Sequence, residues 1–261
     1  MLTFIKLGGS LITDKRIEAS FRQEPTARIA QEISRARQEN PDLQLIVGHG
    51  SGSFGHFAAK QYQTIAGVHT REQWRGFAEV ATVASELNYL VAREFSAAGV
   101  PVWRLQPSAS AISRDGVLVS LALESPRQGL ENGLVPLVYG DVALDEVRGG
   151  TIISTETIFF YMAKHLPVNR ILLLGEVEGV MDSAGQVIPT ITPANFAAIQ
   201  QYLGGSAGTD VTGGMVTKVQ DMLTLAKQVS GLTIRIMDGR QPGLLFETLL
   251  GKVEPGTLIS G

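Results

Sequence analysis

Short apolar and β-branched runs alternate along this chain with longer stretches of helical periodicity, and this alternation constrains the fold most. The short runs predict strands. The expected strands are Leu2–Leu7, Leu43–Val47, Val100–Leu105, Leu134–Tyr139, Arg170–Leu174 and Leu232–Met237. Helices between strands act as crossovers, which favour parallel pairing. The sequence therefore predicts an α/β fold with a mostly parallel central sheet covered on both faces.

Two stretches show helical periodicity clearly. Residues 25–40 place Ile29 and Ile33 one turn apart, with a proline at a plausible first helical position and another just beyond the end. A longer pattern extends from about Arg71 to Ala98. Its apolar side is formed by Trp74, Phe77, Val80, Val83, Leu87 and Val91. Such a stripe usually packs into a core, but it could also line a pocket for an apolar substrate.

Composition excludes several classes of protein. With 261 residues, 44% hydrophobic and 18% charged, the chain can bury a large core. A net charge of -3 gives no general attraction to nucleic acid or membranes, so any anion site must be built locally. The absence of cysteine excludes disulfides and thiol chemistry. No apolar run approaches the roughly 20 residues that span a bilayer, and glycines interrupt the N-terminus early, so we expect a cytoplasmic protein.

The stretch GHGSGSFGH, residues 48–56, contains the GxGxxG letters of a dinucleotide-binding fingerprint. That fingerprint belongs after the first strand, with an acidic residue ending the next strand about 20 positions later. Here the glycines follow the second strand, and Glu72, at the right count, falls in a predicted helix. A glycine turn without a ligand is the plain alternative. Because backbone N–H groups past a strand suit an anion, we predict a phosphate site and not an NAD site.

Two Gly-Gly turns elsewhere are accompanied by lysines. The segment KLGGSLITDK contains Lys6 and Lys15, and VTGGMVTK places Lys218 one turn inside a helical pattern. Neither matches the P-loop. A lone lysine is usually a solvated surface charge, but three lysines near glycine turns suit a polyphosphate. Backbone N–H groups would bind its oxygens, and the lysines would neutralise its charge.

These segments, in this order and with a terminal PGTLISG, resemble the amino acid kinase superfamily, and the GSFGH and TGGM…K segments resemble isopentenyl phosphate kinases within it. The similarity extends from Phe4 to Ile259. It implies an open αβα sandwich in a single domain, residues 1–261. The acceptor-binding lobe would comprise about residues 1–165 and the nucleotide-binding lobe about 166–261.

The resemblance also implies an activity. Such enzymes use ATP, with Mg²⁺, to phosphorylate isopentenyl phosphate to isopentenyl diphosphate in isoprenoid biosynthesis. The partners expected are therefore a small-molecule phosphate acceptor and a second copy in a homodimer, with no nucleic acid and no membrane.

Matching the motifs residue by residue gives each position an implied role. The catalytic residues would be Lys6, Lys15, His56 and Lys218, with Lys15 stabilising the transition state. The acceptor would contact Ser51, Gly55, His56 and Thr155. ATP would contact Lys6, Gly8, Gly9, Ser10, Gly52, Glu176, Met181, Gly214 and Lys218. Glu156 would orient the lysines.

Several positions depart from the family's usual motifs. Ser51 replaces the middle glycine of His-Gly-Gly-Gly-Ser-Phe-Gly-His. In STET, Thr155 replaces a glycine and Glu156 an aspartate. EVEGV, residues 176–180, replaces Asp-Val-Asp-Gly-Val, and Met181 stands where an aromatic residue is common. The acidic groups are retained on longer side chains, so we expect the reaction type to be kept and the substrate preference to be affected.

The chemistry is consistent with these residues without reference to the family. A phosphate with a second pKa near 6 is largely deprotonated at pH 7, so it needs no general base, only positioning and positive charge. His56 is predicted to bind the acceptor phosphate in its charged form. His49 either does the same or fixes the turn. Asp141 either orients a lysine, holds Mg²⁺ through water or caps a turn.

Two alternatives remain open from the sequence. One is a sibling kinase with another phosphate or phosphonate acceptor, such as fosfomycin. The other is a nucleotide-binding protein of the same fold that has lost catalysis, although retention of all three lysines argues against it.

Overall fold

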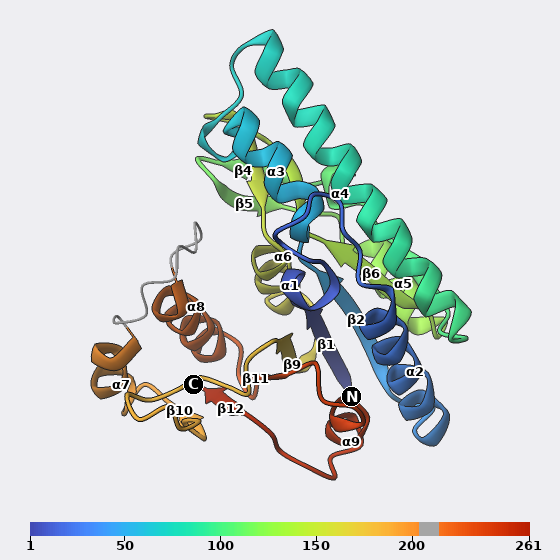
Figure 1. The fold of residues 1–261 in the computed structure, drawn as a ribbon, viewed down its shortest axis with the longest axis vertical. Coiled ribbons are helices and arrows are strands. Elements are labelled where there is room, and N and C mark those ends of the chain that lie inside the picture. Colours follow the sequence, from blue (N-terminus) through green and yellow to red (C-terminus); the bar gives the residue numbers. More distant parts are fainter. Residues whose placement is uncertain (204–213) are drawn as a thin grey trace.

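The main sheet of the computed structural model is mostly parallel, as predicted (Figure 1). The backbone is described for residues 1–203 and 214–261, and side chains for 1–201 and 216–261. The strand order is β10-β12-β11-β9-β1-β2-β6-β3, and among the described strands of this main sheet only β11 and β12 pair antiparallel. The strands are β1 (Leu2–Leu7), β2 (Gln44–His49), β3 (Val102–Arg104), β6 (Val135–Tyr139), β9 (Val168–Gly175), β10 (Thr190–Ile191), β11 (Thr233–Asp238) and β12 (Thr257–Ser260).

Helices cover both faces of this sheet. Helices α2 (Gln23–Glu39), α4 (Arg71–Ala97) and α9 (Leu244–Leu249) share one apolar core with the sheet. Helices α5 (Glu124–Glu131), α6 (Thr155–Ala163), α7 (Phe196–Leu203) and α8 (Gly214–Gln228) share the other. Successive residues of a strand point to opposite faces, so Phe4 packs in the second core and Ile5 in the first. This arrangement confirms the αβα sandwich.

A second sheet was not predicted from the sequence. It is formed by β5 (Val117–Ser120), β4 (Ile112–Arg114), β7 (Asp141–Asp145) and β8 (Gly149–Ile153), in that order. Helix α3 (Gly52–Tyr62) and α4 pack beside it over a small apolar cluster of Ala58, Val80 and Val142. Two short 3-10 turns, Thr64–Ala66 and Pro107–Ala109, complete this region.

The predicted elements of the main sheet are confirmed with small shifts. Strand β1 has the predicted bounds, and α4 ends one residue early, at Ala97. Helix α2 begins at Gln23, two residues before the proline taken as its start. Thr70 caps α4 through a reciprocal pair of hydrogen bonds with Gln73. In the described part of the chain, no helix is long and apolar enough to cross a membrane.

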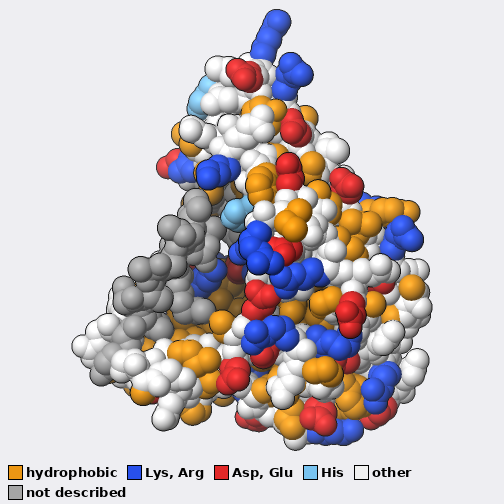
Figure 2. Space-filling model, viewed as in Figure 1, with side chains coloured by type: hydrophobic (Ala, Val, Ile, Leu, Met, Phe, Trp, Pro, Cys, Tyr) orange, Lys and Arg blue, Asp and Glu red, His pale blue; other side chains and the backbone are white. Residues whose placement is uncertain are grey.

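The parallel strands bring their carboxyl ends to one edge of the sheet, where ligands of such folds bind. Strands β1 and β2 are neighbours and end at Leu7 and His49, beside the predicted glycine turns. Strands β9 and β11 end at the same edge, at Gly175 and Asp238. The space-filling view shows a hollow between the lobe carrying α7 and α8 and the rest of the molecule (Figure 2).

Candidate active site

The two glycine turns at the ends of β1 and β2 meet backbone to backbone. Gly8 donates its N–H to the carbonyl of Leu174 at 2.8 Å, and Gly50 donates to Leu7 at 3.3 Å. A Cβ placed on Gly9 would lie only 3.0 Å from the Cα of Gly52. A side chain at Gly9 would therefore require the backbone of the second turn to shift. The glycines therefore permit a close approach of two loops, which the sequence analysis did not predict.

Thr13 locks the two turns together, and the sequence reasoning missed this residue. Its hydroxyl donates to the carbonyl of Gly9 at 2.7 Å and accepts the N–H of Ser53 at 3.0 Å. The side chain is fully buried. Thr13 lies in the KLGGSLITDK segment, four residues after Gly9 and just past the short helix α1 (Gly9–Ile12), which contains Ser10. The sequence signal that could have identified it is a threonine four residues after the second glycine of the Gly-Gly turn, where its hydroxyl can reach that glycine's carbonyl.

Two of the three predicted lysines converge on Glu156. Lys6 points to the same face of β1 as Phe4, and its ammonium forms an ion pair with Glu156 in the first turn of α6. Partial burial pushes the pKa of Glu156 up, but the charge of Lys6, with a contribution from Lys218, leaves the pKa below its usual value. Lys218 is half-buried in the first turns of α8. The two lysines thus favour the charged form of Glu156, and Lys6 does so through a direct ion pair.

Lys15 lies on the exposed loop between α1 and α2, and the structure does not bring it into the Lys6–Glu156 pair. Its neighbours Asp14 and Arg16 pair with each other at 2.7 Å. The far side of the loop is fastened to the second glycine turn, since Ser20 donates its N–H to the Ser53 hydroxyl at 3.1 Å. The loop that carries Lys15 is therefore tied at both ends, through Thr13 and Ser20, to Ser53 at the start of α3.

Ser51, Gly55 and His56 are grouped at the start of α3. Ser51 precedes the helix, and a Cβ placed on Gly55 would lie 2.5 Å from the Ser51 Cβ. Gly55 thus leaves room for the serine that replaces the usual glycine. His56 is exposed on the next position of the helix. Three of the four predicted acceptor residues therefore lie within about one and a half turns at the start of this helix.

Thr155 and His49 have buried, structural contacts. The Thr155 hydroxyl donates to the carbonyl of His49 at 2.6 Å, so it is occupied inside the protein. The His49 ring is fully buried, and burial, with a smaller effect from Arg104, lowers its pKa to about 4. Of the two roles considered for His49, the structure favours fixing the turn. Any contact of Thr155 with a ligand would be through its backbone.

The predicted nucleotide side is built from β9, α8 and the C-terminal strand. Glu176 forms an ion pair with Arg22 at 2.8 Å, and both side chains are about one-third exposed, 35% and 36%. Met181 forms an isolated β-bridge with Val187. The hydroxyl of Thr257, in the terminal PGTLISG segment, accepts the N–H of Val180 at 2.8 Å.

The remaining predicted nucleotide residue is Gly214, which begins α8. The preceding part of the TDVTGG stretch, residues 209–213, lies outside the described residues.

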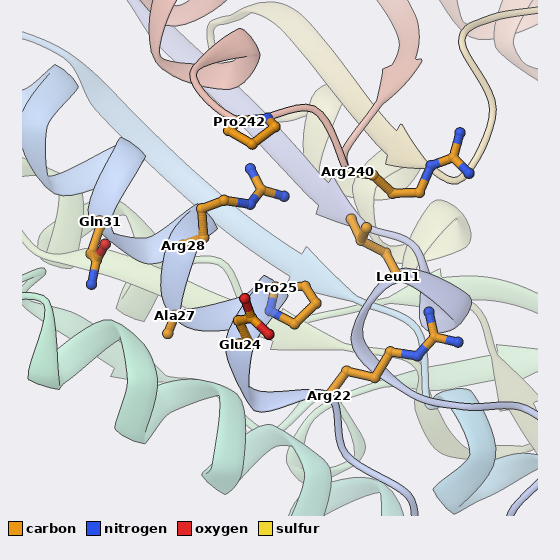
Figure 3. A pocket seen from close by; sticks show the side chains of 9 residues that line it. All are labelled: Leu11, Arg22, Glu24, Pro25, Ala27, Arg28, Gln31, Arg240 and Pro242. Carbon is orange, nitrogen blue, oxygen red and sulfur yellow. The ribbon is translucent and has the colours of Figure 1, made fainter.

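A cavity of about 580 Å³ lies beside this edge, between α2 and the loop after β11 (Figure 3). It is lined by Leu11, Arg22, Glu24, Pro25, Ala27, Arg28, Gln31, Arg240 and Pro242. Its three arginines each pair with a carboxylate, namely Arg22 with Glu176, Arg28 with Glu32 and Arg240 with Asp238. Because these charges are already paired, the cavity is a weaker anion site than the glycine turns.

The acidic residues near the edge are also engaged. Asp141 is buried, accepts the N–H groups of Ser108 and Val142, and has a pKa raised by burial, so it caps a turn. Within the residues that the structure describes, no group of three or more acidic or histidine side chains could hold a metal ion. The described side chains therefore do not form a cage for Mg²⁺.

Comparison with known proteins agrees with this geometry. The model of the amino acid kinase family matches residues 1–238. The isopentenyl phosphate kinase of Methanocaldococcus jannaschii is 32% identical over 97% of each chain. That of Methanothermobacter thermautotrophicus is 33% identical over 100% of this chain and 99% of its own. A solved structure of an isopentenyl phosphate kinase superposes with a TM-score of 0.83 at 29% identity, covering 100% of both chains.

Proposed function

The chain belongs to the amino acid kinase family, and from this premise we propose that it transfers the γ-phosphoryl group of ATP to isopentenyl phosphate, forming isopentenyl diphosphate. One observation carries the proposal from the structure. Two glycine turns meet at the edge of the sheet beside a carboxylate that pairs with Lys6 and whose pKa is lowered by the charges of Lys6 and Lys218. Full-length similarity to isopentenyl phosphate kinases supports the choice of acceptor.

The acceptor phosphate would bind the loop that begins α3. Ser51, Gly55 and His56 lie within about one and a half turns there, and the exposed His56 imidazole can reach a ligand from solvent. A phosphate oxygen is already deprotonated at neutral pH, so the attacking group needs no base. The work of the loop is to hold a dianion in line with the ATP phosphates.

The lysines would compensate for the charge that accumulates when two phosphates meet. Lys6 forms an ion pair with Glu156, and the charge of Lys218 also acts on this carboxylate, so both lysines contribute positive charge to this region. Lys15 would approach from the exposed loop above α3. Preorganised charges of this kind act mainly on the transition state, since they need little rearrangement when the charge moves.

The nucleotide would occupy the other half of the edge. Glu176, Met181, Gly214 and Lys218 come from β9, its following loop and α8. Gly8, Gly9, Ser10 and Gly52 would face the phosphates from the turns. We expect Mg²⁺ to be held mainly by phosphate oxygens, because the carboxylates nearby are paired with lysine and arginine. The lobe boundary near residue 165, a homodimer and a cytoplasmic location also remain predictions.

The five-carbon tail would lie over the apolar cluster between α3, α4 and the small sheet. Phe77 packs against the Ala58–Val80–Val142 cluster, and Trp74 meets its ring edge-on with centroids 5.3 Å apart. On α3, Ala58 of this cluster is two residues beyond His56, and Ala59, which packs against the cluster, is three residues beyond it. An apolar surface at that distance from the phosphate site suits a short isoprenoid.

The test is ADP formation by the purified chain with ATP, Mg²⁺ and one acceptor at a time. The acceptors are isopentenyl, dimethylallyl and geranyl phosphates and fosfomycin, with phosphorus NMR to identify products. We expect the highest kcat/KM with isopentenyl phosphate and a diphosphate product. A preference for fosfomycin would mean that the acceptor is a phosphonate and not isopentenyl phosphate. ATP binding without turnover on any acceptor would contradict the proposal that the chain is a kinase.

A further inference from the structure

A buried chain of polar side chains extends from the surface to the underside of the phosphate loop. Arg104, at the end of β3, donates its Nε–H to the Oδ1 of Asn88 at 2.8 Å. The Nδ2 of Asn88, in the middle of α4, lies 3.0 Å from the Nε2 of His49. The Nδ1 of His49 lies 2.9 Å from the carbonyl oxygen of Gly50. Asn88 and His49 are both fully buried.

The direction of every hydrogen bond in this chain follows from Arg104. A guanidinium can only donate, so it fixes Oδ1 of Asn88 as the acceptor and turns the Nδ2 amino group toward His49. His49 must then accept at Nε2 and carry its proton on Nδ1, which donates to Gly50. A low pKa, caused chiefly by burial, keeps the ring neutral in this single tautomer.

The last bond of the chain orients a peptide of the phosphate loop. In a trans peptide the C=O and the following N–H point in opposite directions. Holding the Gly50 carbonyl against the buried His49 therefore turns the N–H of Ser51 away from the interior. His49 is fixed from its other side as well, because its own carbonyl accepts from Thr155 at 2.6 Å and from the N–H of Gly140 at 3.1 Å.

We infer that His49, Asn88 and Arg104 are positioning residues that aim the Ser51 N–H at the acceptor phosphate. The inference rests on the proposed function, since it needs the phosphate to lie on this loop. None of the three touches the substrate in this account. Their effect is to set one backbone donor before the acceptor arrives, which lowers the cost of binding.

The decisive variant is Asn88→Asp, which has nearly the same shape but two accepting oxygens. His49 must then donate from Nε2 to the new carboxylate. When neutral, it has no proton left on Nδ1 for Gly50. When doubly protonated, it can donate from both nitrogens. In this variant the new carboxylate should raise the pKa of His49 above its wild-type value. The variant should therefore keep the bond from His49 to the Gly50 carbonyl at low pH and lose it as pH rises through that pKa.

Two measurements read this out. Long-range proton–nitrogen NMR of the histidine rings should show the Nδ1–H tautomer in the wild type and a shift to Nε2–H in Asn88→Asp at high pH. The ratio of variant to wild-type kcat/KM for isopentenyl phosphate should fall about tenfold or more as pH rises, with the KM for ATP little changed. Taking the ratio cancels the titration of His56 and of the phosphate itself.

The other titratable or charged groups near His49 are the same in the wild type and in the Asn88→Asp variant. They are Arg104 on β3, Tyr139 on β6, whose ring stacks on His49 at 5.8 Å, and Asp141 on β7. Burial raises the pKa of both Tyr139 and Asp141, so each titrates away from its usual range. Their contributions are also removed by the ratio.

Arg104→Ala is the second variant, because Arg104 is exposed and its loss should not prevent folding. It should give a mixture of His49 tautomers and a smaller rise in acceptor KM. Leu87→Ala is the control, since Leu87 is fully buried beside Asn88 in the helix and outside the chain of hydrogen bonds. It should lower thermal stability and leave both KM values and the tautomer unchanged.

The outcomes are separable. A wild-type ring in the Nε2–H tautomer, or an unchanged pH ratio in Asn88→Asp, overturns the positioning role while leaving the kinase intact. If Leu87→Ala lowered the kcat/KM for isopentenyl phosphate as much as Asn88→Asp does, the effect would be due to general destabilisation and not to positioning. Absence of kinase activity in the wild type with the tautomer as expected would instead overturn the proposed function.

Discussion

The two halves of the sheet edge are held in different ways. The proposed acceptor side rests on buried hydrogen bonds, in which Thr13 accepts the N–H of Ser53, His49 bonds the carbonyl of Gly50, and Thr155 donates to the carbonyl of His49. The predicted nucleotide side depends on a partly exposed ion pair, Arg22–Glu176, and on one buried hydroxyl, Thr257. Buried bonds to backbone fix geometry strongly, whereas exposed ion pairs contribute little. The acceptor half is therefore the preorganised half.

The largest expected effect is on Lys15, which lies on an exposed loop and belongs to neither set of contacts. Lys15→Ala should lower kcat by about 10²-fold or more, because it removes a charge acting on the transferring phosphoryl group. ATP affinity should change little. Steady-state kinetics with Lys164→Ala, an exposed lysine at the far end of α6, serve as the control. An unchanged kcat would make Lys15 an ordinary surface lysine.

A smaller effect is expected where the acceptor half meets the substrate tail. Phe77→Ala should raise the kcat/KM ratio of geranyl to isopentenyl phosphate by about tenfold, since it enlarges an apolar pocket. Leu249→Ala, buried in the core of α9, is the control for lost stability. If both variants are destabilised and neither changes chain-length preference, Phe77 is only core.

The small sheet of the acceptor half offers a test by pH. Asp145 accepts backbone N–H groups from Asp115, Gly116, Val147 and Arg148. Burial alone would raise its pKa, but these bonds lower it to about 2. A lowered carboxylate pKa stabilises the fold above the unfolded value, and this contribution is lost as pH falls toward 2.

Asp145→Asn should therefore lower the free energy of unfolding by about 1–2 kcal/mol at neutral pH. It should also make the free energy of unfolding fall less steeply as the pH is lowered. Denaturant unfolding between pH 2 and pH 7 measures both. Identical acid profiles for variant and wild type would mean that Asp145 does not anchor this sheet.

The smallest effect is expected on the nucleotide half. Arg22→Ala should cost only about 0.2–1 kcal/mol of stability, because the ion pair is partly solvated. Arg114→Ala breaks a comparable surface pair with Glu146 and should behave alike. A loss of several kcal/mol for Arg22→Ala alone would show that the two halves are joined more tightly than the contacts indicate.

Sequence periodicity predicted six of the eight described strands of the main sheet, all but β10 and β12, and none of the small sheet. Strands such as β1 are continuous apolar runs because both faces are buried, so they are recognisable alone. Strands β4 and β5 span three and four residues and alternate with exposed positions. The turn between them is held by Asp145, which accepts the N–H groups of Asp115 and Gly116, about 30 residues earlier in the chain. No local sequence pattern reveals such a long-range contact.

The candidate site shows the same division. Motifs identified the lysines, the glycines and His56, because these residue types have few other reasons to occur together. They did not identify Asn88 or Arg104, whose roles arise only when α4 and β3 pack beneath the loop. Thr155 was expected to face the acceptor, but its hydroxyl is turned inward to His49.

The most direct test of the account is to measure the affinities of isopentenyl phosphate and of a non-hydrolysable ATP analogue separately, by calorimetry, for wild type, His56→Ala and His56→Gln. Removing a charged hydrogen bond should cost about 1.5–3 kcal/mol of acceptor binding in His56→Ala, with ATP-analogue affinity nearly intact and partial recovery in His56→Gln. Equal losses for both ligands, or no loss for either, would contradict the placement of the acceptor phosphate on the loop of residues 48–56.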